Sequence, residues 1–263
     1  MKNTLVVLKL SFVLSLSLFG QGMYWESTVH RSFGGSDKDM TSKFYAMPKM
    51  FRSEDGDQHT AIIRLDKGVI ININNDDSTY TEMTFDELES QMKKTGTKMD
   101  DAMAKLQDKL KDMPEDRRKM VEDMMKKNPA FGGGDNAKYE TKKTDETQTI
   151  SGYACTKYVI SQGDKEVMTV WASKDVKVNE ALRTDMQEFR SRMAAMIPRI
   201  GSAMFEGMKT VDGFPVQMES PNYKSTVTKV ISKDTPSAQF EAPANYKKTK
   251  PAFMGDDKEE KKD

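Results

Sequence analysis

An apolar stripe with helical spacing runs through residues 178–208. Its members recur at alternating steps of four and three residues, which places them on one face of a helix. They are Leu182, Met186, Phe189, Met193, Met196 and Ile200. The residues between them, including Asp185 and Arg190, are polar and predict an opposite face in contact with water. Pro198 should end or kink this helix one residue earlier, because proline lacks a backbone N–H and clashes with the preceding turn.

Short stretches that alternate between apolar and polar residues precede this helix and follow it. Clusters of Gly, Asn and Asp separate them, and Asp55-Gly56 is a strong hairpin signal. Pro48 falls inside one stretch and indicates an edge strand or a bulge. The pattern predicts strands at residues 24–33, 42–52, 59–65, 69–73, 78–83, 139–148, 153–161, 167–173, 214–219 and 224–232, with a short piece around Phe240.

The period of the pattern becomes helical within residues 84–134. Thr84 and Glu87 have the spacing of a capping box, in which each side chain bonds the backbone N–H of the other residue. Gly96 is expected to end the first helix, and a second helix covers residues 100–111. Pro114 then suits the first turn of a third helix. We therefore predict a helical insertion at residues 84–134 between two halves of one sheet.

Together these elements predict a mainly β (α+β) fold. A curved antiparallel sheet or half-barrel would have the long amphipathic helix against it and the helical insertion between its halves. A single β-rich domain would cover residues 23–246. Residues 247–263 are mostly lysine, aspartate and glutamate, which predicts a disordered charged tail.

A secretory signal peptide is predicted at residues 1–22. Lysines flank and interrupt an apolar run at residues 5–19, and Gly20 and Gly22 supply the small residues that a signal peptidase requires. The run is shorter than the about 20 apolar residues of a membrane span, and an uncleaved anchor is the alternative. No transmembrane span is predicted in the mature chain. We expect export to the periplasm, association with the outer membrane, or secretion.

Composition narrows the set of partners. Lys+Arg and Asp+Glu both number 41, so no net charge attracts the protein to nucleic acid or to an acidic membrane surface. Cys155 is the only cysteine, which excludes an internal disulfide and leaves the core to supply stability. We expect Cys155 to be a buried small apolar residue, with a reactive thiol as the alternative.

No catalytic or cofactor site is visible in the sequence. His30 and His59 are the only histidines, and no nucleophile elbow, zinc-protease helix or phosphate-binding loop is present. Met47 and Met50 have a spacing that suits Cu(I), although methionine more simply fills gaps in a core. We predict a protein that is not an enzyme and holds no metal or cofactor.

Several motifs, chiefly in the second half of the chain, resemble a bacterial family of exported proteins. They are Gly152-Tyr153-Ala154-Cys155-Thr156-Lys157-Tyr158, Trp171, Gly213-Phe214-Pro215, Phe240-Glu241-Ala242-Pro243 and Tyr246. The family carries the label domain of unknown function, number forty-four twelve. Residues 84–134 depart from its simpler members, so the resemblance implies no role for them.

The predicted architecture also looks like that of the outer-membrane lipoprotein carriers and receptors. Those proteins have a curved antiparallel sheet whose hollow face is closed by helices over an apolar cavity that holds acyl chains. The likeness is one of fold alone, and fold does not imply function. No carrier motif maps onto this chain, so no functional residue is transferred from those proteins.

Two hypotheses on function follow. In the first, the apolar stripe lines a space between helix and sheet and binds a lipid or an acylated protein, because methionine adapts to ligands of varied shape. In the second, the stripe fills a solid core, as such stripes usually do, and residues 84–134 hold an envelope protein partner. Helices of about 12 residues are marginal alone, so these helices must pack on the sheet, on each other or on a partner.

Overall fold

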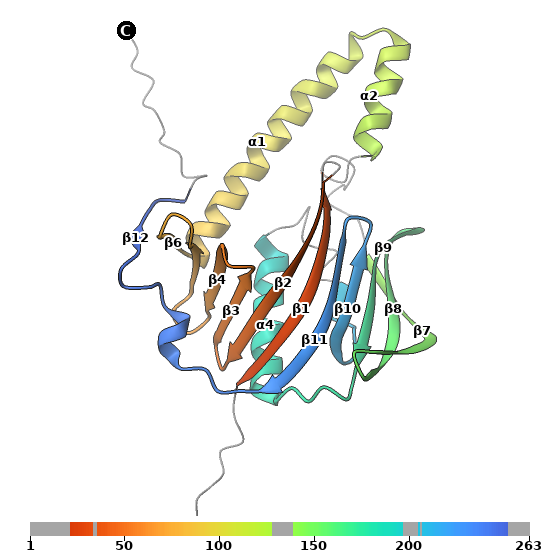
Figure 1. Cartoon of the computed structure of the whole chain (residues 1–263). Coiled ribbons are helices and arrows are strands. Elements are labelled where there is room, and N and C mark those ends of the chain that lie inside the picture. The colour runs from red at the N-terminus through yellow and green to blue at the C-terminus, as the bar shows by residue number, and fades with distance from the viewer. Residues whose placement is uncertain (1–21, 34–35, 128–138, 197–204, 206, 252–263) are drawn as a thin grey trace, which may run out of the picture.

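One sheet dominates the described part of the chain, which in this computed structural model comprises residues 22–33, 36–127, 139–196, 205 and 207–251 (Figure 1). Within these ranges the sheet has 12 strands, and every neighbouring pair is antiparallel except the last strand with its partner. Listed across the sheet, the strands are β12 (Lys247–Lys248), β6 (Thr79–Thr84), β5 (Val69–Asn74), β4 (His59–Arg64), β3 (Met50–Asp55), β2 (Ser36–Met47), β1 (Met23–Phe33), β11 (Tyr223–Ser232), β10 (Phe214–Ser220), β9 (Lys165–Ser173), β8 (Tyr153–Gln162) and β7 (Tyr139–Ile150).

The sheet consists of two meanders that meet in its middle. Strands β1 to β6 follow one another across one half, and strands β7 to β11 follow one another across the other half. The two halves are joined where β1 pairs with β11, with Ser27 opposite Val227 and Val29 opposite Ser225. The first strand of the chain is therefore held by one of the last, and the helical segment lies between the two meanders in sequence.

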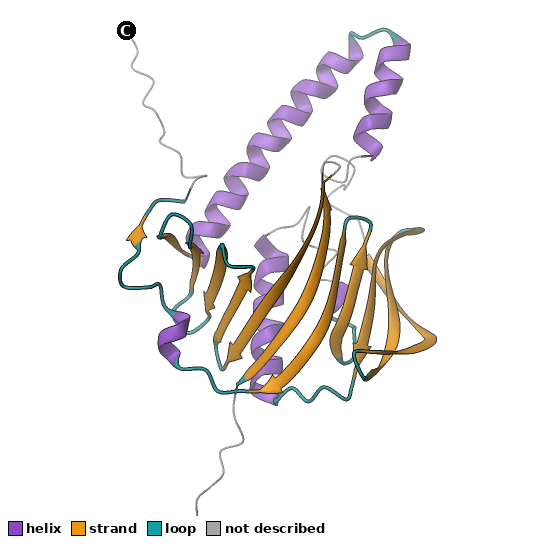
Figure 2. Ribbon diagram, in the orientation of Figure 1, coloured by secondary structure: helices purple, strands orange, loops and turns teal. Residues whose placement is uncertain are grey.

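The α-helices α1, α2 and α4 and one short 3-10 helix accompany the sheet, and residues 205, 207 and 208 are helical too (Figure 2). Helix α4 (Glu180–Met196) lies along one face of the curved sheet, whereas α1 (Phe85–Lys111) and α2 (Glu115–Lys127) extend beyond it (Figure 1). The 3-10 helix η1 (Ser237–Phe240) lies near the strands β3 and β4. This arrangement confirms the predicted fold class.

Both faces of the sheet bury apolar side chains. On the side that carries α4, which we call the helix face, Leu182 packs with Val216 and Val227. On the opposite side, the outer face, Phe240 of η1 packs with Ile62 and Ile71, and all three are fully or nearly fully buried. Two cores arise because neighbouring residues of a strand point to opposite faces, so a covered strand can bury both sets.

The predicted strand at residues 42–52 is wrong, because the chain turns back within it. Met47 pairs directly with Met50, so Pro48 and Lys49 form a two-residue hairpin turn between β2 and β3. Lys49 has a φ of 62°, and proline followed by a residue of positive φ fits a type II turn. Lysine rarely adopts this conformation, which is why the sequence did not signal a turn here.

The expected helix end at Gly96 is also wrong. Helix α1 runs through Gly96 as one helix of 27 residues. Met92 and Met99 are seven residues apart, so the apolar positions before and after the glycine stay in phase and favour one continuous helix. The predicted capping box is confirmed: the Glu87 N–H donates to Thr84 Oγ1 at 3.1 Å, and the Thr84 N–H donates to Glu87 Oε2 at 2.8 Å.

The C-terminal segment continues past the expected start of the tail at residue 247. Lys247–Lys248 form β12, and the Thr249 N–H donates to the carbonyl of Tyr80 at 2.8 Å. Residues 252–263, like the predicted signal peptide up to residue 21, lie outside the described residues, so these two domain assignments remain predictions.

An ion-pair cluster fastens this segment to the outer face. Arg64 is only 6% exposed and bonds Asp66 Oδ2 at 2.6 Å, and it also bonds the carboxylate of Glu241. Lys67 Nζ reaches Glu241 Oε1 at 2.7 Å. The Arg64 hydrogen bond lowers the pKa of Asp66. Burial raises the pKa of Glu241, but hydrogen bonds from Lys67 and Arg64 outweigh it, so that this pKa is lowered too.

We expect this cluster to make stability depend on pH. The folded state holds the pKa values of Asp66 and Glu241 below their ordinary 3.8 and 4.5, so near those values it binds fewer protons than the unfolded chain. The stabilisation is therefore complete above about pH 5 and is lost as the pH falls through the lowered values. The urea midpoint should fall more between about pH 6 and about pH 3 in the wild-type chain than in an Asp66→Asn/Glu241→Gln variant.

An Asp164→Asn variant is the matched control, because Asp164 lies exposed in the turn between β8 and β9. It should follow the wild-type dependence on pH. An equal loss of stability in the double variant and the wild-type chain would show that the Arg64 cluster does not sense pH.

Candidate ligand-binding pocket

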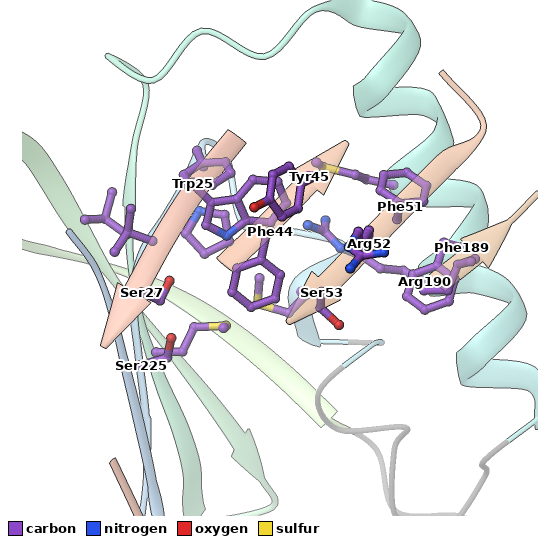
Figure 3. Close-up of a pocket in the computed structure, with 18 of the residues that line it drawn as sticks. Trp25, Ser27, Phe44, Tyr45, Phe51, Arg52, Ser53, Phe189, Arg190 and Ser225 are labelled. Carbon is purple, nitrogen blue, oxygen red and sulfur yellow. The ribbon is translucent and has the colours of Figure 1, made fainter. Parts of the chain in front are cut away.

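A cavity of about 410 Å³ lies between α4 and the helix face of the sheet (Figure 3). Its walls come from the strands β1 to β4, β10 and β11, from α4, and from Phe205 and Met208, which follow α4 in the chain. The cavity therefore spans the line where the two meanders join. Trp25, Phe44 and Phe51 are among its lining residues, as are Met186 and Phe189.

Aromatic rings form the sheet wall. Trp25 and Phe44 are directly opposite each other on β1 and β2, so their side chains share a face. Their rings stack with centroids 4.9 Å apart and planes 7° from parallel. Phe214 of β10 meets Trp25 edge-on at 5.7 Å. This packing fixes the rings and makes the wall rigid and apolar.

Helix α4 supplies the facing wall. Phe189 lies 6.3 Å from Phe51 of the sheet, and Phe205 meets Phe189 edge-on at 6.5 Å, both measured between ring centroids. Met186 lies one turn before Phe189 on the same side of the helix. Because methionine changes its shape easily, this wall can adapt to an apolar ligand.

A buried carboxylate holds α4 in place. Asp185 is 4% exposed and accepts the backbone N–H of Lys49 at 2.8 Å and its ammonium group at 2.9 Å. The Lys49 ammonium also reaches Glu188 at 2.8 Å, and this hydrogen bond lowers the pKa of Glu188. The hairpin turn between β2 and β3 is thus clamped to two successive turns of α4. The prediction that Asp185 faces water is wrong, because the hairpin covers it.

The predicted site residues divide among different surroundings. Met186 and Phe189 line the cavity, whereas Leu182 is 1% exposed and lies in the packed core. Met193 is half-buried and is not among the lining residues. The side chain of Met196 and all of Ile200 lie outside what the structure describes. Among the residues described, the first member of the stripe therefore packs in the core, and Met186 and Phe189, in its middle, line the cavity.

Arg190 lines the cavity, although its polarity predicted an exposed position. It follows Met186 by four residues, and residues at that spacing share a helix side. Burial in these surroundings lowers the pKa of Arg190, because an apolar environment disfavours the charged form. The sequence could have indicated this position, because Arg190 lies between Phe189 and Met193 of the apolar stripe.

The other candidate residues lie outside this cavity lining. His30 Nδ1 is 2.7 Å from Asp39 Oδ1 at an exposed place, and His59 begins β4, also exposed. Cys155 is buried as predicted, and burial raises the pKa of its thiol. Such a thiol is less reactive than a free one at neutral pH.

Met47 and Met50, which were considered for Cu(I), flank the two-residue turn between β2 and β3. Both pack against the outer-face core, and the Thr235 N–H donates to Met47 Sδ at 3.4 Å. Within the described ranges, no group of three or more His, Cys, Asp or Glu side chains is placed to hold a metal ion. None of the helices described is long and apolar enough to cross a membrane.

These features define a class of protein in which one curved, open antiparallel sheet carries a helix over an apolar cavity. The chain belongs to the family described as "Domain of unknown function (DUF4412)", whose model matches residues 86–246, most of the chain. The matched span contains the motifs that carry the resemblance seen in the sequence. It also contains α1, from Asp86 onward, and α2.

Several solved structures are similar to this chain, all at low similarity. PNGF-II matches with a TM-score of 0.37 and 13% identity, over 87% of this chain and 31% of that one. The Pseudomonas aeruginosa MucA/MucB complex matches with a TM-score of 0.36 and 9% identity, over 85% of this chain and 56% of that one. The LolA superfamily protein NE2245 from Nitrosomonas europaea matches with a TM-score of 0.29 and 5% identity, over 84% and 90%.

This chain spans about a third of PNGF-II and just over half of the chain matched in the MucA/MucB complex. No curated protein matches it. A LolA superfamily protein is thus among the similar structures, as the sequence led us to expect, but the likeness reveals nothing about a ligand.

We expect Asp185→Ala to destabilise the protein by about 1–3 kcal/mol, because the partly buried hydrogen bond from the Lys49 N–H is lost with its acceptor. Urea unfolding measures the change. Glu180→Ala is the matched control: Glu180 is an exposed acid in the first turn of α4 and should change stability by less than about 0.5 kcal/mol. Equal effects of the two variants would show that the clamp does not fix α4.

Proposed function

We propose that this protein is a non-enzymatic, exported envelope protein that binds an amphiphile between α4 and the sheet. The ligand is a lipid or the acyl chain of an acylated protein. The observation that carries the proposal is the apolar cavity of about 410 Å³, walled by stacked aromatic rings on one side and by Met186 and Phe189 on the other. Its size falls within the roughly 300–1,000 Å³ of typical ligand pockets.

Hydrocarbon is the ligand chemistry that these walls favour. Each CH₂ group moved from water to an apolar site contributes about 0.8 kcal/mol, so ten of them contribute about 8 kcal/mol before the entropic cost of binding. An empty apolar cavity forfeits dispersion contacts along its lining. An acyl chain would restore those contacts, and the methionine wall would accept chains of different lengths and shapes.

The lack of catalytic chemistry in the pocket supports binding over catalysis. Neither histidine nor Cys155 is among the lining residues described. The polar side chains of the lining are those of Ser27, Tyr45, Arg52, Ser53, Arg190, Tyr223 and Ser225. Arginine stays protonated at neutral pH and is a poor general base. An apolar ligand also suits an exported protein, because such a molecule needs a protected site to cross an aqueous compartment. Export itself rests on the signal peptide predicted at residues 1–22.

Filling the cavity should abolish ligand uptake. We expect Met186→Trp to reduce binding of palmitate and phospholipid at least about tenfold, since the larger side chain occupies the space. Binding is measured by displacement of the neutral fluorophore N-phenyl-1-naphthylamine and by native mass spectrometry. Met120→Trp is the matched control, because Met120 of α2 is 60% exposed and is not among the lining residues. It should bind as the wild-type chain does.

Two outcomes would contradict the proposal. One is a wild-type chain that carries no extractable lipid and takes up neither palmitate nor phospholipid. The other is a Met186→Trp variant that remains folded, as judged by urea unfolding, and still binds with wild-type affinity.

A second candidate function is that of a module which holds an envelope protein partner through α1 and α2. The observation that favours it is the extension of both helices beyond the sheet (Figure 1). The guanidinium carbon of Arg192 of α4 lies 5.3 Å from the centroid of the Phe85 ring. The start of α1 is therefore fixed against α4, while its far end extends outward. A projection of this kind offers surface to a partner without disturbing the cavity.

Removal of the projection separates this candidate from the first. A chain in which residues 85–134 are replaced by a short flexible linker should lose a partner that cross-links to the wild-type chain in cells, yet keep palmitate binding. Met120→Glu tests the same surface without deletion and should weaken the cross-link. If the same partner stays bound to both variants, α1 and α2 do not hold it.

A further inference from the structure

Arg190 places a positive charge in the lining of the cavity. The cavity lining in the described chain includes no aspartate and no glutamate. Within that part of the chain, the Arg190 side chain has no hydrogen bond and no ion pair. Figure 3 shows Arg190 beside Phe189 on one side of the pocket, away from Ser27 and Ser225.

Other arginines near the sheet and on α4 do have partners. Arg52 of β3, which is also among the lining residues, donates to Glu54 at 2.8 Å and to the carbonyl of Gln239 at 2.8 Å. Arg192, only two residues from Arg190, reaches Glu188 at 3.1 Å. Arg52 and Arg192 are thus paired, whereas Arg190 has no carboxylate partner among the residues that the structure describes.

An unpaired charge that is partly buried against apolar side chains lowers the stability of the folded protein, so a structural role does not explain Arg190. Moving a charged group out of water is costly unless an opposite charge or hydrogen bonds compensate. The lowered pKa of Arg190 reflects this burial. Arginine nevertheless stays protonated at neutral pH, so the group cannot escape the cost by losing its proton. A bound anion would supply the missing partner.

We propose that Arg190 binds the anionic group, a carboxylate or a phosphate, of an amphiphile whose hydrocarbon chain lies against Trp25 and Phe44. This inference rests on the proposed function and names the class of ligand. The planar guanidinium forms two parallel hydrogen bonds to a carboxylate or a phosphate. The aromatic wall would then accept the chain while Arg190 sets its direction in the pocket.

Ligands of equal chain length test the inference. Palmitate, hexadecyl phosphate and the neutral 1-hexadecanol are compared by displacement of N-phenyl-1-naphthylamine from protein expressed from the full-length chain. We expect both anions to bind the wild-type protein at least roughly tenfold more tightly than the alcohol. If palmitate binds more tightly than hexadecyl phosphate, the site prefers the carboxylate of a free fatty acid. If hexadecyl phosphate binds more tightly, the site prefers a phosphate head group.

Variants at one position isolate the charge. Arg190→Met should remove the preference for anions and leave the affinity for 1-hexadecanol within about twofold, whereas Arg190→Lys should retain the preference. Arg192→Met is the matched control and should retain it too. Urea unfolding should show that Arg190→Met is at least as stable as the wild-type chain, because the variant removes an unpaired, partly buried charge.

The outcomes separate the two proposals. Equal binding of the acid and the alcohol by the wild-type protein, or an anion preference that survives Arg190→Met, would overturn the role of Arg190 and leave the pocket as a site for neutral amphiphiles. A strongly destabilised Arg190→Met variant would overturn it as well, since Arg190 would then support the fold. Failure of all three ligands to bind would overturn the proposed function itself.

Discussion

The pairing of β1 with β11 is the constraint on which the rest of the structure depends. It joins the two meanders into one sheet and places Trp25 of β1 beside the strands that carry Phe214 and Val227. The two paired strands are separated by almost the whole chain, so the entropy of closing a long loop opposes the contact. Burial of the aromatic and aliphatic wall offsets that cost, and the same wall bounds the cavity. The join and the candidate site therefore depend on the same side chains.

Helix α4 shows how two polar residues on one helix come to have different roles. Asp185 is buried and has its hydrogen bonds satisfied by the backbone N–H and ammonium group of Lys49, so it clamps the helix to the β2–β3 hairpin. Arg190 faces the cavity without a partner in the described chain. The Asp185 carboxylate has its hydrogen bonds within the protein and needs no further partner. The Arg190 guanidinium lacks such a partner in the described chain, and we infer that a ligand supplies one. This contrast turns an apolar cavity into a site with a preferred ligand chemistry.

This sheet buries side chains on its outer face as well as on its helix face, and two helices project beyond it. The C-terminal segment covers β3 to β6 through Phe240 and the Arg64 cluster, so the sheet edge near β6 is paired with β12 instead of being left open. Coverage of an edge also limits unwanted pairing between molecules. Helices α1 and α2 lie within the span that matches the family model, although residues 84–134 depart from the family's simpler members.

The sequence by itself determined the elements whose signals are local. Alternation and helical spacing predicted the sheet, α4 and the helical segment, and Thr84 with Glu87 marked the start of α1. Tertiary structure decided whatever depended on neighbours: the turn at Lys49, the continuity of α1 through Gly96, and the pairing of β12 with β6. It also decided which part of the α4 stripe is core and which lines the cavity. Periodicity orders residues around one helix axis, but burial and pairing depend on elements that lie far away in the chain, and those are brought together only by the fold.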